Sequence, residues 1–418
     1  MIKAIKGTKD ILPKDIPAWN FIENIVAEKM RQFNYKEIRT PVFEETALFS
    51  RGIGEATDIV GKEMYTFTDR SNNSVTLRPE MTASVVRALI EHFLDKQQNL
   101  NKLYYISPMF RQERPQAGRL RQFHQFGAEA LGSNDPSLDA EMIILAYDII
   151  KEFGIKNLTV KINSLGVPSS REEYKTILRD YLKDKFENLS EESKNRYETN
   201  ILRLFDSKDE HDQEIMKNAP LLLEHLDDES LEHFEKVKQI LLSAKVPFEI
   251  DPKLVRGLDY YTNTTFEIVS SSVGSQSALC GGGRYNLLVN QLGGKEVPAV
   301  GFAAGIERIL LACETEESLN LPEEKLDCYI VRLDKELSAK AYEYGLLLRR
   351  AGLEVELDYS LRSIKAQMRE ANRLNAKYTL LVGGEEFENN KVVLKNMETS
   401  EQQNIDFENI ESIIKIIK

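Results

Sequence analysis

The segment FRQERPQAGRLRQFHQFGAEALG, residues 110–132, decides the fold that we predict for this chain. Strand-forming residues lead into it from position 103, the tract RPQAG at 114–118 holds the proline and glycine typical of a loop, and the remainder returns as a second strand. Side chains on a strand alternate between its two faces. One face of the predicted antiparallel hairpin therefore carries Arg111 and Glu113 on the first strand, and Arg119, Arg121, Phe123, Gln125 and Glu129 on the second.

This polar face has two interpretations. An antiparallel strand that is half buried normally turns polar residues to water, so the hairpin could be a surface ribbon. It could instead be a ligand trough, because the guanidinium groups of Arg111 and Arg121 can bind phosphate oxygens in pairs and the ring of Phe123 can stack on an aromatic base. The residue types favour a site for a phosphorylated aromatic ligand with a second, polar ligand beside it.

The composition describes an ordinary globular protein. The 418 residues, 42% hydrophobic and 29% charged, suggest two or three domains. The formal net charge of −12 argues against a nucleic-acid partner for the chain as a whole, but it leaves room for a local basic patch. The N-terminus lacks the apolar core of a signal peptide and no apolar run approaches a membrane span, so we expect a cytoplasmic protein without membrane contact.

The cysteines and histidines give no sign of a metal site. Cys280, Cys313 and Cys328 stand singly, and the five histidines have no ligand-like spacing with them. We therefore expect reduced, mostly buried cysteines and no metal site built by the protein itself.

The region before the hairpin should contain two helices and several strands. Apolar residues at helical spacing predict a helix over 16–35, and a strand should follow it and stop near Pro41, with a polar loop beyond. A strand pair turning at 71–74 then enters a helix near Glu80. Glu80 and Thr82 could satisfy the free amides of the first helical turn, or their carboxylate and hydroxyl could meet a ligand ammonium group.

The region after the hairpin changes character twice. A helix ending near Gly154 and a further strand come first, and residues 169–245, rich in Glu, Lys, Asp and Leu, then predict a helical insertion with solvated outer faces. Residues 254–269, LVRGLDYYTNTTFEIV, return to β character. Arg256 within them could be no more than a cation at a surface turn.

Two glycine-rich tracts, CGGGRYNLLV at 280–289 and AVGFAAGIERILLA at 299–312, close this region. Neither has the spacing of a phosphate-binding loop. The glycines instead predict strands that pass close to a ligand or to each other. The second tract runs from strand to helix, which places Arg308 in the first turns of the helix and aims it at the sheet.

The last part of the chain should be a separate domain. An acidic linker near 315–325 precedes residues 326–418, where strands and helices alternate, which predicts a compact α/β domain with a mixed sheet. Its second predicted helix carries basic residues at three- and four-residue steps, namely Arg362, Lys365, Arg369, Arg373 and Lys377, against Glu370. This stripe is either a solvated helix face or an RNA contact.

Several of these tracts together resemble a known family. FRQE with RQFHQFGAE resembles motif 2 of class II aminoacyl-tRNA synthetases, LVRGLDYYT resembles the peptide that separates histidyl-tRNA synthetases from other class II enzymes, and residues 280–312 resemble motif 3. The resemblance implies an α+β fold, with a class II antiparallel sheet flanked by helices as a catalytic domain over 1–320. The helical insertion interrupts this domain, and a C-terminal α/β anticodon-binding domain follows over 326–418.

The resemblance also implies an activity. Such an enzyme activates histidine with ATP to histidyl-adenylate and transfers the histidyl group to the 3′ end of tRNA(His), with Mg²⁺ bound mainly through the phosphates of ATP. The stretch around Pro41 resembles motif 1, which implies a homodimer. TLRPEMT at 76–82 resembles the stretch whose carboxylate and hydroxyl hold the amino group of the amino acid.

Roles for individual residues follow from the same resemblance. Arg111 and Arg256 would be catalytic, stabilising charge on the α-phosphate. The residues implied in histidine binding are Glu80, Thr82, Arg111, Gln125, Glu129, Tyr260, Tyr261 and Tyr285. Those implied in ATP binding are Arg111, Glu113, Arg121, Phe123 and Arg308. The tRNA acceptor end would meet Arg114, Gln116 and Arg119, and the anticodon-binding domain would offer the basic helix of Arg362, Lys365, Arg369 and Arg373.

Two other functions share parts of this pattern. A non-catalytic paralogue serves as the regulatory subunit of ATP phosphoribosyltransferase in histidine biosynthesis, but it usually lacks the LVRGLDYY-type residues and the anticodon domain, which this sequence has. A synthetase-like RNA-binding protein would keep the basic helix without needing arginines around a phosphate. The sequence favours the ligase over both.

Overall fold

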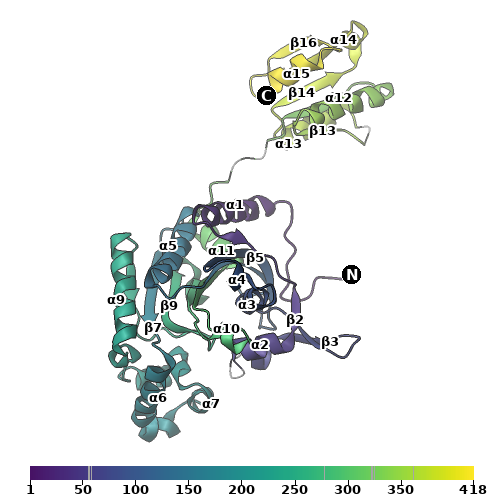
Figure 1. The fold of residues 1–418 in the computed structure, drawn as a ribbon. Helices are drawn as coiled ribbons and strands as arrows, with labels where there is room; N and C mark the ends of the chain where they lie inside the picture. The colour runs from purple at the N-terminus through teal and green to yellow at the C-terminus, as the bar shows by residue number, and fades with distance from the viewer. Residues whose placement is uncertain (55–56, 58, 277, 322, 324, 361) are drawn as a thin grey trace. The chain divides into compact units, whose positions relative to one another are not determined.

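The computed structural model of the chain describes residues 1–54, 57, 59–276, 278–321, 323, 325–360 and 362–418. It contains two compact units, Met1–Leu321 and Pro322–Lys418 (Figure 1). The three cysteines have free thiols and are buried, as expected. Of the helices formed by the described residues, none combines the length and apolar character that crossing a membrane requires.

The first unit is built around one sheet of eight strands. Their spatial order is β1 (Lys36–Glu37), β5 (Asn101–Phe110), β6 (Gln122–Leu131), β11 (Ala299–Gly305), β10 (Ala278–Arg284), β9 (Thr262–Ser270), β7 (Leu158–Ser164) and β8 (Phe248–Ile250). The inner pairs are antiparallel, and only the outermost pairs, β1 with β5 and β7 with β8, are parallel. This antiparallel-rich sheet confirms the predicted fold class.

Strands β5 and β6 form the predicted hairpin. They pair continuously, and Met109 lies opposite Phe123 while Ser107 lies opposite Gln125. Residues directly opposite each other point to the same face of a sheet. The predicted alternation is therefore confirmed for Phe123 and Gln125.

The loop of the hairpin is longer than predicted, since the strands end at Phe110 and resume at Gln122. Its backbone bonds to other segments as well as across the hairpin, where the Arg111 N–H donates to the Arg121 carbonyl oxygen at 2.9 Å. The Gln112 N–H donates to a carbonyl oxygen of residue 63 at 2.7 Å, and the Arg121 N–H donates to that of residue 7 at 2.7 Å. Strand β6 begins at Gln122, so strand alternation does not determine where Arg119 and Arg121 point.

One face of this sheet is covered by helices. They are α1 (Ile16–Gln32), α5 (Pro136–Glu152), α9 (Asp228–Ser243) and α11 (Ile306–Glu316). Their apolar sides meet sheet residues such as Phe126, Phe266 and Phe302 in the main hydrophobic core. The helices predicted at the N-terminus and after the hairpin are thereby confirmed.

Helix α9 needs separate mention because it lies inside the predicted insertion, 169–245. Its Phe234, Val237 and Leu241 are buried in the main core, and the helix runs beside α5 (Figure 1). This helix therefore packs as part of the layer that covers the sheet.

The remaining residues of that segment form the predicted helical body. It comprises α6 (Pro168–Leu182), η2 (Lys183–Asn188), α7 (Glu191–Thr199), η3 (Ile201–Asp206), α8 (Glu210–Met216) and η4 (Leu222–His225). Tyr174, Leu178 and Leu182 of α6 are fully buried. Their spacing puts them on one side of the helix and leaves the charged residues of α6 on the other.

The other face of the sheet meets α3 (Thr82–Glu91), α4 (Leu94–Gln97), α10 (Leu288–Gln291) and a small sheet of β2 (Phe43–Glu45), β4 (Ser74–Leu77) and β3 (Tyr65–Thr68). The polar loop predicted after Pro41 is wrong, because β2 and α2 (Thr46–Ile53) occupy that stretch. Phe49 and Ile53 are four residues apart and fully buried against Ala83. Burial of this short apolar stripe stabilises a helix whose neighbours are polar. The short η1 (Ile59–Glu63) and η5 (Ser271–Gln276) complete the unit.

The second unit has the predicted mixed sheet. Its strands lie in the order β13 (Val355–Leu357), β12 (Cys328–Arg332), β14 (Tyr378–Val382), β15 (Lys391–Asn396) and β16 (Gln402–Asp406). The first three are parallel and the last two antiparallel. The helical elements are η6 (Lys335–Leu337), α12 (Ser338–Arg350), α13 (Ile364–Arg373), α14 (Gly384–Glu388) and α15 (Ile410–Ile417).

The predicted basic helix is α13, and it is shorter than expected, so Arg362 precedes it. Arg362 pairs with Asp358 at 2.5 Å, and Arg373 pairs with Glu370 at 2.5 Å. Lys377, beyond the helix, pairs with Asp327 at 2.7 Å. Carboxylates thus pair with the basic residues at both ends of the predicted stripe, and Lys365 and Arg369 form its middle.

Candidate functional site

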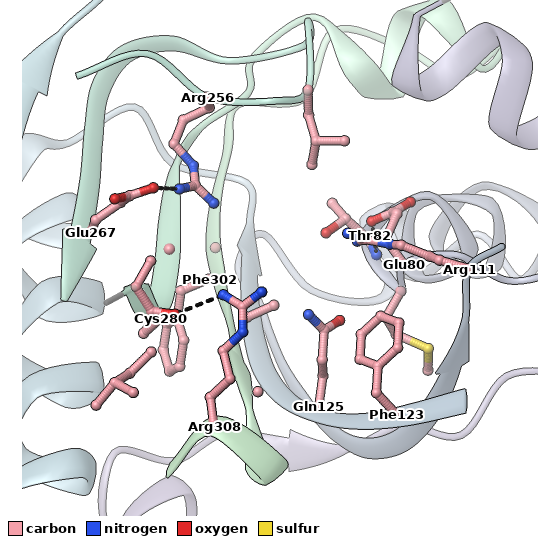
Figure 2. Close-up of a pocket in the computed structure, with 18 of the residues that line it drawn as sticks. Glu80, Thr82, Arg111, Phe123, Gln125, Arg256, Glu267, Cys280, Phe302 and Arg308 are labelled. Carbon is pink, nitrogen blue, oxygen red and sulfur yellow. Dashed lines mark hydrogen bonds and ion pairs between the residues drawn. The ribbon is translucent and has the colours of Figure 1, made fainter. Parts of the chain in front are cut away.

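One cavity of about 480 Å³ brings distant segments of the first unit together. Arg111 follows β5, Arg256 lies before β9, and Arg308 lies in the first turn of α11, and all three line it. In Figure 2, Arg256 and Arg308 extend from one side and Glu80, Thr82 and Arg111 lie on the other. Cations that are far apart in sequence thus face a common space.

Arg111 is held at the end of its strand by two contacts. Its Nε donates to the Pro79 carbonyl oxygen at 2.9 Å, and its guanidinium carbon lies 5.3 Å from the centre of the Phe123 ring. The first contact fixes the side chain and the second is a cation–π interaction. The Nη1 atom lies 3.9 Å from Glu113 Oε1, and the residue lines the cavity.

Arg256 is paired with Glu267 of β9. Burial by itself would lower the pKa of Arg256, but the carboxylate of Glu267 together with Tyr261, Cys280 and Tyr260 raises it overall. The side chain therefore stays cationic in a site shielded from water. This geometry depends on a glycine, since a Cβ on Gly281 would lie 2.2 Å from Arg256 Nη2. The prediction that the glycine tract allows close approach is confirmed here.

Arg308 joins two elements at the rim of the cavity. Its Nη1 donates to the Ala278 carbonyl oxygen at 2.9 Å, and its Nε donates to that of Gly118 at 3.1 Å. Burial lowers the pKa of Arg308, and the neighbouring cation of Arg119 lowers it further. An anion in the cavity would relieve both effects.

Glu80 satisfies free amides in the first turn of a helix, which is one of the two roles that the sequence predicted for it. Its carboxylate accepts hydrogen bonds from the backbone N–H groups of Thr82 at 2.7 Å and Ala83 at 2.8 Å, at the start of α3. Burial nevertheless raises its pKa. The carboxylate also lines the cavity, so helix capping and ligand binding are compatible in this structure.

Glu129 forms the deepest polar group of the cavity. It accepts hydrogen bonds from the hydroxyls of Thr82 at 2.7 Å, Tyr105 at 3.4 Å and Tyr285. Burial raises the pKa of Glu129 to about 8, although these donors act in the opposite direction. A Cβ on Gly301, its partner on β11, would lie 1.8 Å from Glu129 Oε2, so this side chain too needs a glycine opposite it.

Three tyrosines wall the end of the cavity near Glu129. The ring centre of Tyr260 lies 4.7 Å from that of Tyr261 and 5.5 Å from that of Tyr285. Burial raises the pKa of all three phenols, so their hydroxyls stay protonated and can donate. Gln125 lies nearby, and its buried Oε1 has no hydrogen-bond partner among the described residues. An acceptor left in this state is ready for a ligand donor.

The cavity includes Phe123 and Arg119, but its lining does not extend to Glu113, Arg114, Gln116 or Arg121 among the described residues. Arg121 instead donates from Nε to the Glu113 carbonyl oxygen at 3.4 Å. Beside Arg111, the arginine of the hairpin that lines the cavity is thus Arg119. The expectation that Arg121 does so is corrected, because the strand alternation on which it rested ends at Gln122.

Sequence reasoning missed four charged residues of the cavity, Glu267, Glu307, Asp206 and Lys208. Glu267 had a signal, since it is the only charged residue of the strand TNTTFEIVS. Asp206 and Lys208 had none, because they come from the helical insertion. Burial raises the pKa of Asp206 to about 6. The described residues hold no group of three or more His, Cys, Asp or Glu placed to bind a metal ion.

Comparisons with known proteins find relatives along the length of the chain. Residues 7–309 match the family described as histidyl-tRNA synthetase, and residues 327–416 match the anticodon binding domain. The chain is 48% identical to the histidine–tRNA ligase of Halothermothrix orenii over 418 residues, covering 100% of both chains. It is 46% identical to that of Caldanaerobacter subterraneus, covering 99% of this chain and 100% of the relative. The solved structure of apo S. aureus histidyl-tRNA synthetase matches with a TM-score of 0.84 at 41% identity, covering 100% of both chains.

Proposed function

Because this chain belongs to the histidyl-tRNA synthetase family, we propose that its central cavity is where histidine and ATP react. The chain is a ligase that activates histidine with ATP to histidyl-adenylate and transfers the histidyl group to the 3′ end of tRNA(His). The observation that carries the assignment of the site is the convergence of Arg111, Arg256 and Arg308 on a cavity that also contains Glu129.

The first reaction needs cations more than it needs a base. The nucleophile is the substrate carboxylate, which is ionised at neutral pH. Its oxygen bonds to the α-phosphorus of ATP while the bond to the leaving pyrophosphate breaks. The protein must hold two anions together and neutralise charge that develops on the α-phosphate. Arg111 and Arg256, on opposite sides of the cavity, are our candidates for this role (Figure 2).

Histidine would occupy the end of the cavity walled by tyrosines. A neutral imidazole offers one donor and one acceptor, which the Glu129 carboxyl group and the Tyr261 hydroxyl can match. The α-ammonium group would meet Glu80, Thr82 and the unpaired Oε1 of Gln125. A competing amino acid would leave these buried groups unmatched, which is a strong basis for discrimination.

ATP would lie between the hairpin and α11. The Phe123 ring is placed to stack on the adenine, and Arg308 with Arg119 would take the outer phosphates. Glu113, near Arg119 at 3.4 Å, stays our candidate for the adenine amino group. Mg²⁺ would relieve repulsion between the phosphates. The neighbouring carboxylates of Glu267 and Glu307 already accept from Arg256 and His124, so phosphate oxygens are the better ligands for the ion.

Transfer to tRNA would use both units. We propose that the hairpin loop with Arg114, Gln116 and Arg119 meets the acceptor end of tRNA(His). The catalytic domain would span 1–320 and the anticodon-binding domain 326–418, where Lys365 and Arg369 are the basic residues of α13 that we favour for RNA contact. The reactions belong to translation, which places the protein in the cytoplasm.

We also propose a homodimer formed through the segment that resembles motif 1. Val42 and Phe43 are exposed beside a groove lined by Pro41, Leu48 and Leu292, among others. Exposed apolar side chains beside a groove are typical of an interface. Sedimentation of the full chain should give a dimer, and Phe43→Glu should shift it to the monomer. A parent protein that sediments as a monomer at micromolar concentration would contradict this.

The deciding experiment is histidine-dependent exchange of pyrophosphate into ATP. The parent should catalyse it, Arg256→Ala should lose it, and Arg179→Ala, which changes an exposed arginine of α6, should not. A parent protein that catalyses no exchange would favour the regulatory paralogue. That alternative is disfavoured by relatives that match the full length and are ligases.

A further inference from the structure

A second, smaller cavity of about 170 Å³ separates the helical insertion from the segment that supplies Arg256 and Tyr261. Arg171 and Asn200 lie on the insertion side, and Asp259 lies on the other. The two sides are tied by hydrogen bonds. Asn200 Nδ2 donates to Asp259 Oδ1 at 2.7 Å, and Arg171 Nη1 donates to the main-chain oxygen of Tyr261 at 2.9 Å.

The contact made by Arg171 is one of three that hold the chain where Tyr261 enters β9. Two residues on, the Asn263 N–H donates to the Gly166 carbonyl oxygen at 3.0 Å, and the Asn263 carbonyl oxygen accepts from Leu165 N–H at 2.7 Å. Residues 165–171 form the root of the insertion, from the end of β7 through the first turn of α6. This root therefore fixes the backbone on both sides of Thr262.

The backbone at this point needs such support. Asn263 has a φ of +45°, in the left-handed region, which asparagine adopts more readily than most other residues with a side chain. The pairing of β9 with β10 also shifts register here, between Gly283 and Arg284. Unusual backbone conformations of this kind persist only where surrounding contacts determine them. The insertion thus supplies three of the hydrogen bonds that hold the backbone from Tyr261 to Asn263.

A shift of the backbone at Tyr261 would first displace side chains at the end of the cavity where we place histidine. The Tyr261 ring packs against Tyr260, which packs against Tyr285, whose hydroxyl donates to Glu129. The arginine end is secured separately, by the pairing of Arg256 with Glu267. Loss of the hydrogen bond from Arg171 should therefore weaken the binding of histidine more than the binding of ATP.

We propose that Arg171 is a positioning residue for histidine recognition, through which the helical insertion holds the tyrosine wall of the amino acid site. The inference rests on the proposed function of the cavity. It gives the insertion a role in the first reaction, before any tRNA is bound.

The test is steady-state pyrophosphate exchange by the full chain with Arg171→Met, which keeps the length of the side chain and removes the donor. We expect KM for histidine to rise about tenfold, equivalent to about 1.4 kcal/mol. Hydrogen bonds from charged donors are of this order. KM for ATP should stay within about twofold, since uniform damage would move both constants. Arg171→Lys, which keeps a cationic donor, should recover part of the loss, and Arg179→Ala on the exposed side of α6 should match the parent.

An unchanged KM for histidine in Arg171→Met, or an equal rise for both substrates, would overturn the proposal. If Arg171→Met does not fold, the KM values for histidine and ATP are measured for Arg171→Lys and Asn200→Ala instead. A rise confined to histidine supports the inference and its absence refutes it. The proposed function fails separately, since in that case the parent itself would show no exchange.

Discussion

Gly281 lies directly against the guanidinium group of Arg256, so that a methyl group in place of its hydrogen would stand 2.2 Å from Nη2. The obstruction is the far end of a flexible side chain and not backbone, which separates the position of the arginine from the stability of the sheet. Gly281→Ala should therefore displace Arg256 while the protein stays folded. We expect exchange of pyrophosphate to fall about a hundredfold or more, the usual effect of losing one charge-stabilising group in a transition state.

A control for this variant is Gly61→Ala, because nothing lies within 4 Å of a Cβ at Gly61. It should retain parent activity. A Gly281→Ala protein with parent-like exchange would show that the position of Arg256 next to Glu267 is not needed for the reaction.

Glu129 makes stability depend on pH. Burial raises its pKa to about 8 from an ordinary value of 4.5, so the folded chain keeps a proton that the unfolded chain releases. The stability that this proton contributes is complete below the unfolded value and is lost as the pH rises through about 8. Between about pH 5 and 8, the thermal midpoint of the protein without substrates should fall more steeply for the parent than for Glu129→Gln. Equal slopes would rule out the raised pKa.

Arg119 and Arg121 should differ in their effect on ATP. Arg119 lines the cavity, whereas Arg121 is not among the described residues of its lining and donates to the backbone of Glu113. Arg119→Ala should raise KM for ATP about tenfold, as expected for one lost charged hydrogen bond, and Arg121→Ala should leave it within about twofold. The two variants are matched controls for each other. The reverse order of effects would restore the assignment made from strand alternation.

Asp139 and Arg284 form a buried ion pair that should contribute to the stability of the fold. Both side chains are fully buried, and His233 of α9 lies 3.2 Å from Asp139. Asp139→Asn would leave the arginine charge uncompensated, which should lower the free energy of unfolding by about 3–5 kcal/mol. Denaturant titration would measure the loss, with Glu235→Gln on the exposed side of α9 as control. A loss no larger than that of the control would mean that Arg284 finds another partner.

The sequence alone was enough for features whose cause is local. The faces of Phe123 and Gln125 follow from alternation along a strand, and the helices of the insertion follow from apolar spacing, because backbone geometry repeats with a short period. The close approach at Gly281 also follows locally, since only a residue without a Cβ tolerates it. The resemblance to a family then identified which of these features make a site.

Tertiary structure decided the rest. Arg119 and not Arg121 faces the cavity because the loop bonds to residues 7 and 63, and Arg362 is neutralised by Asp358 in a turn outside its helix. Asp206 reaches the cavity from an insertion separated from Arg256 by fifty positions. Such contacts depend on how helices, strands and loops pack against one another. This packing is determined by many side chains that are distant in the sequence, so no local sequence pattern predicts it.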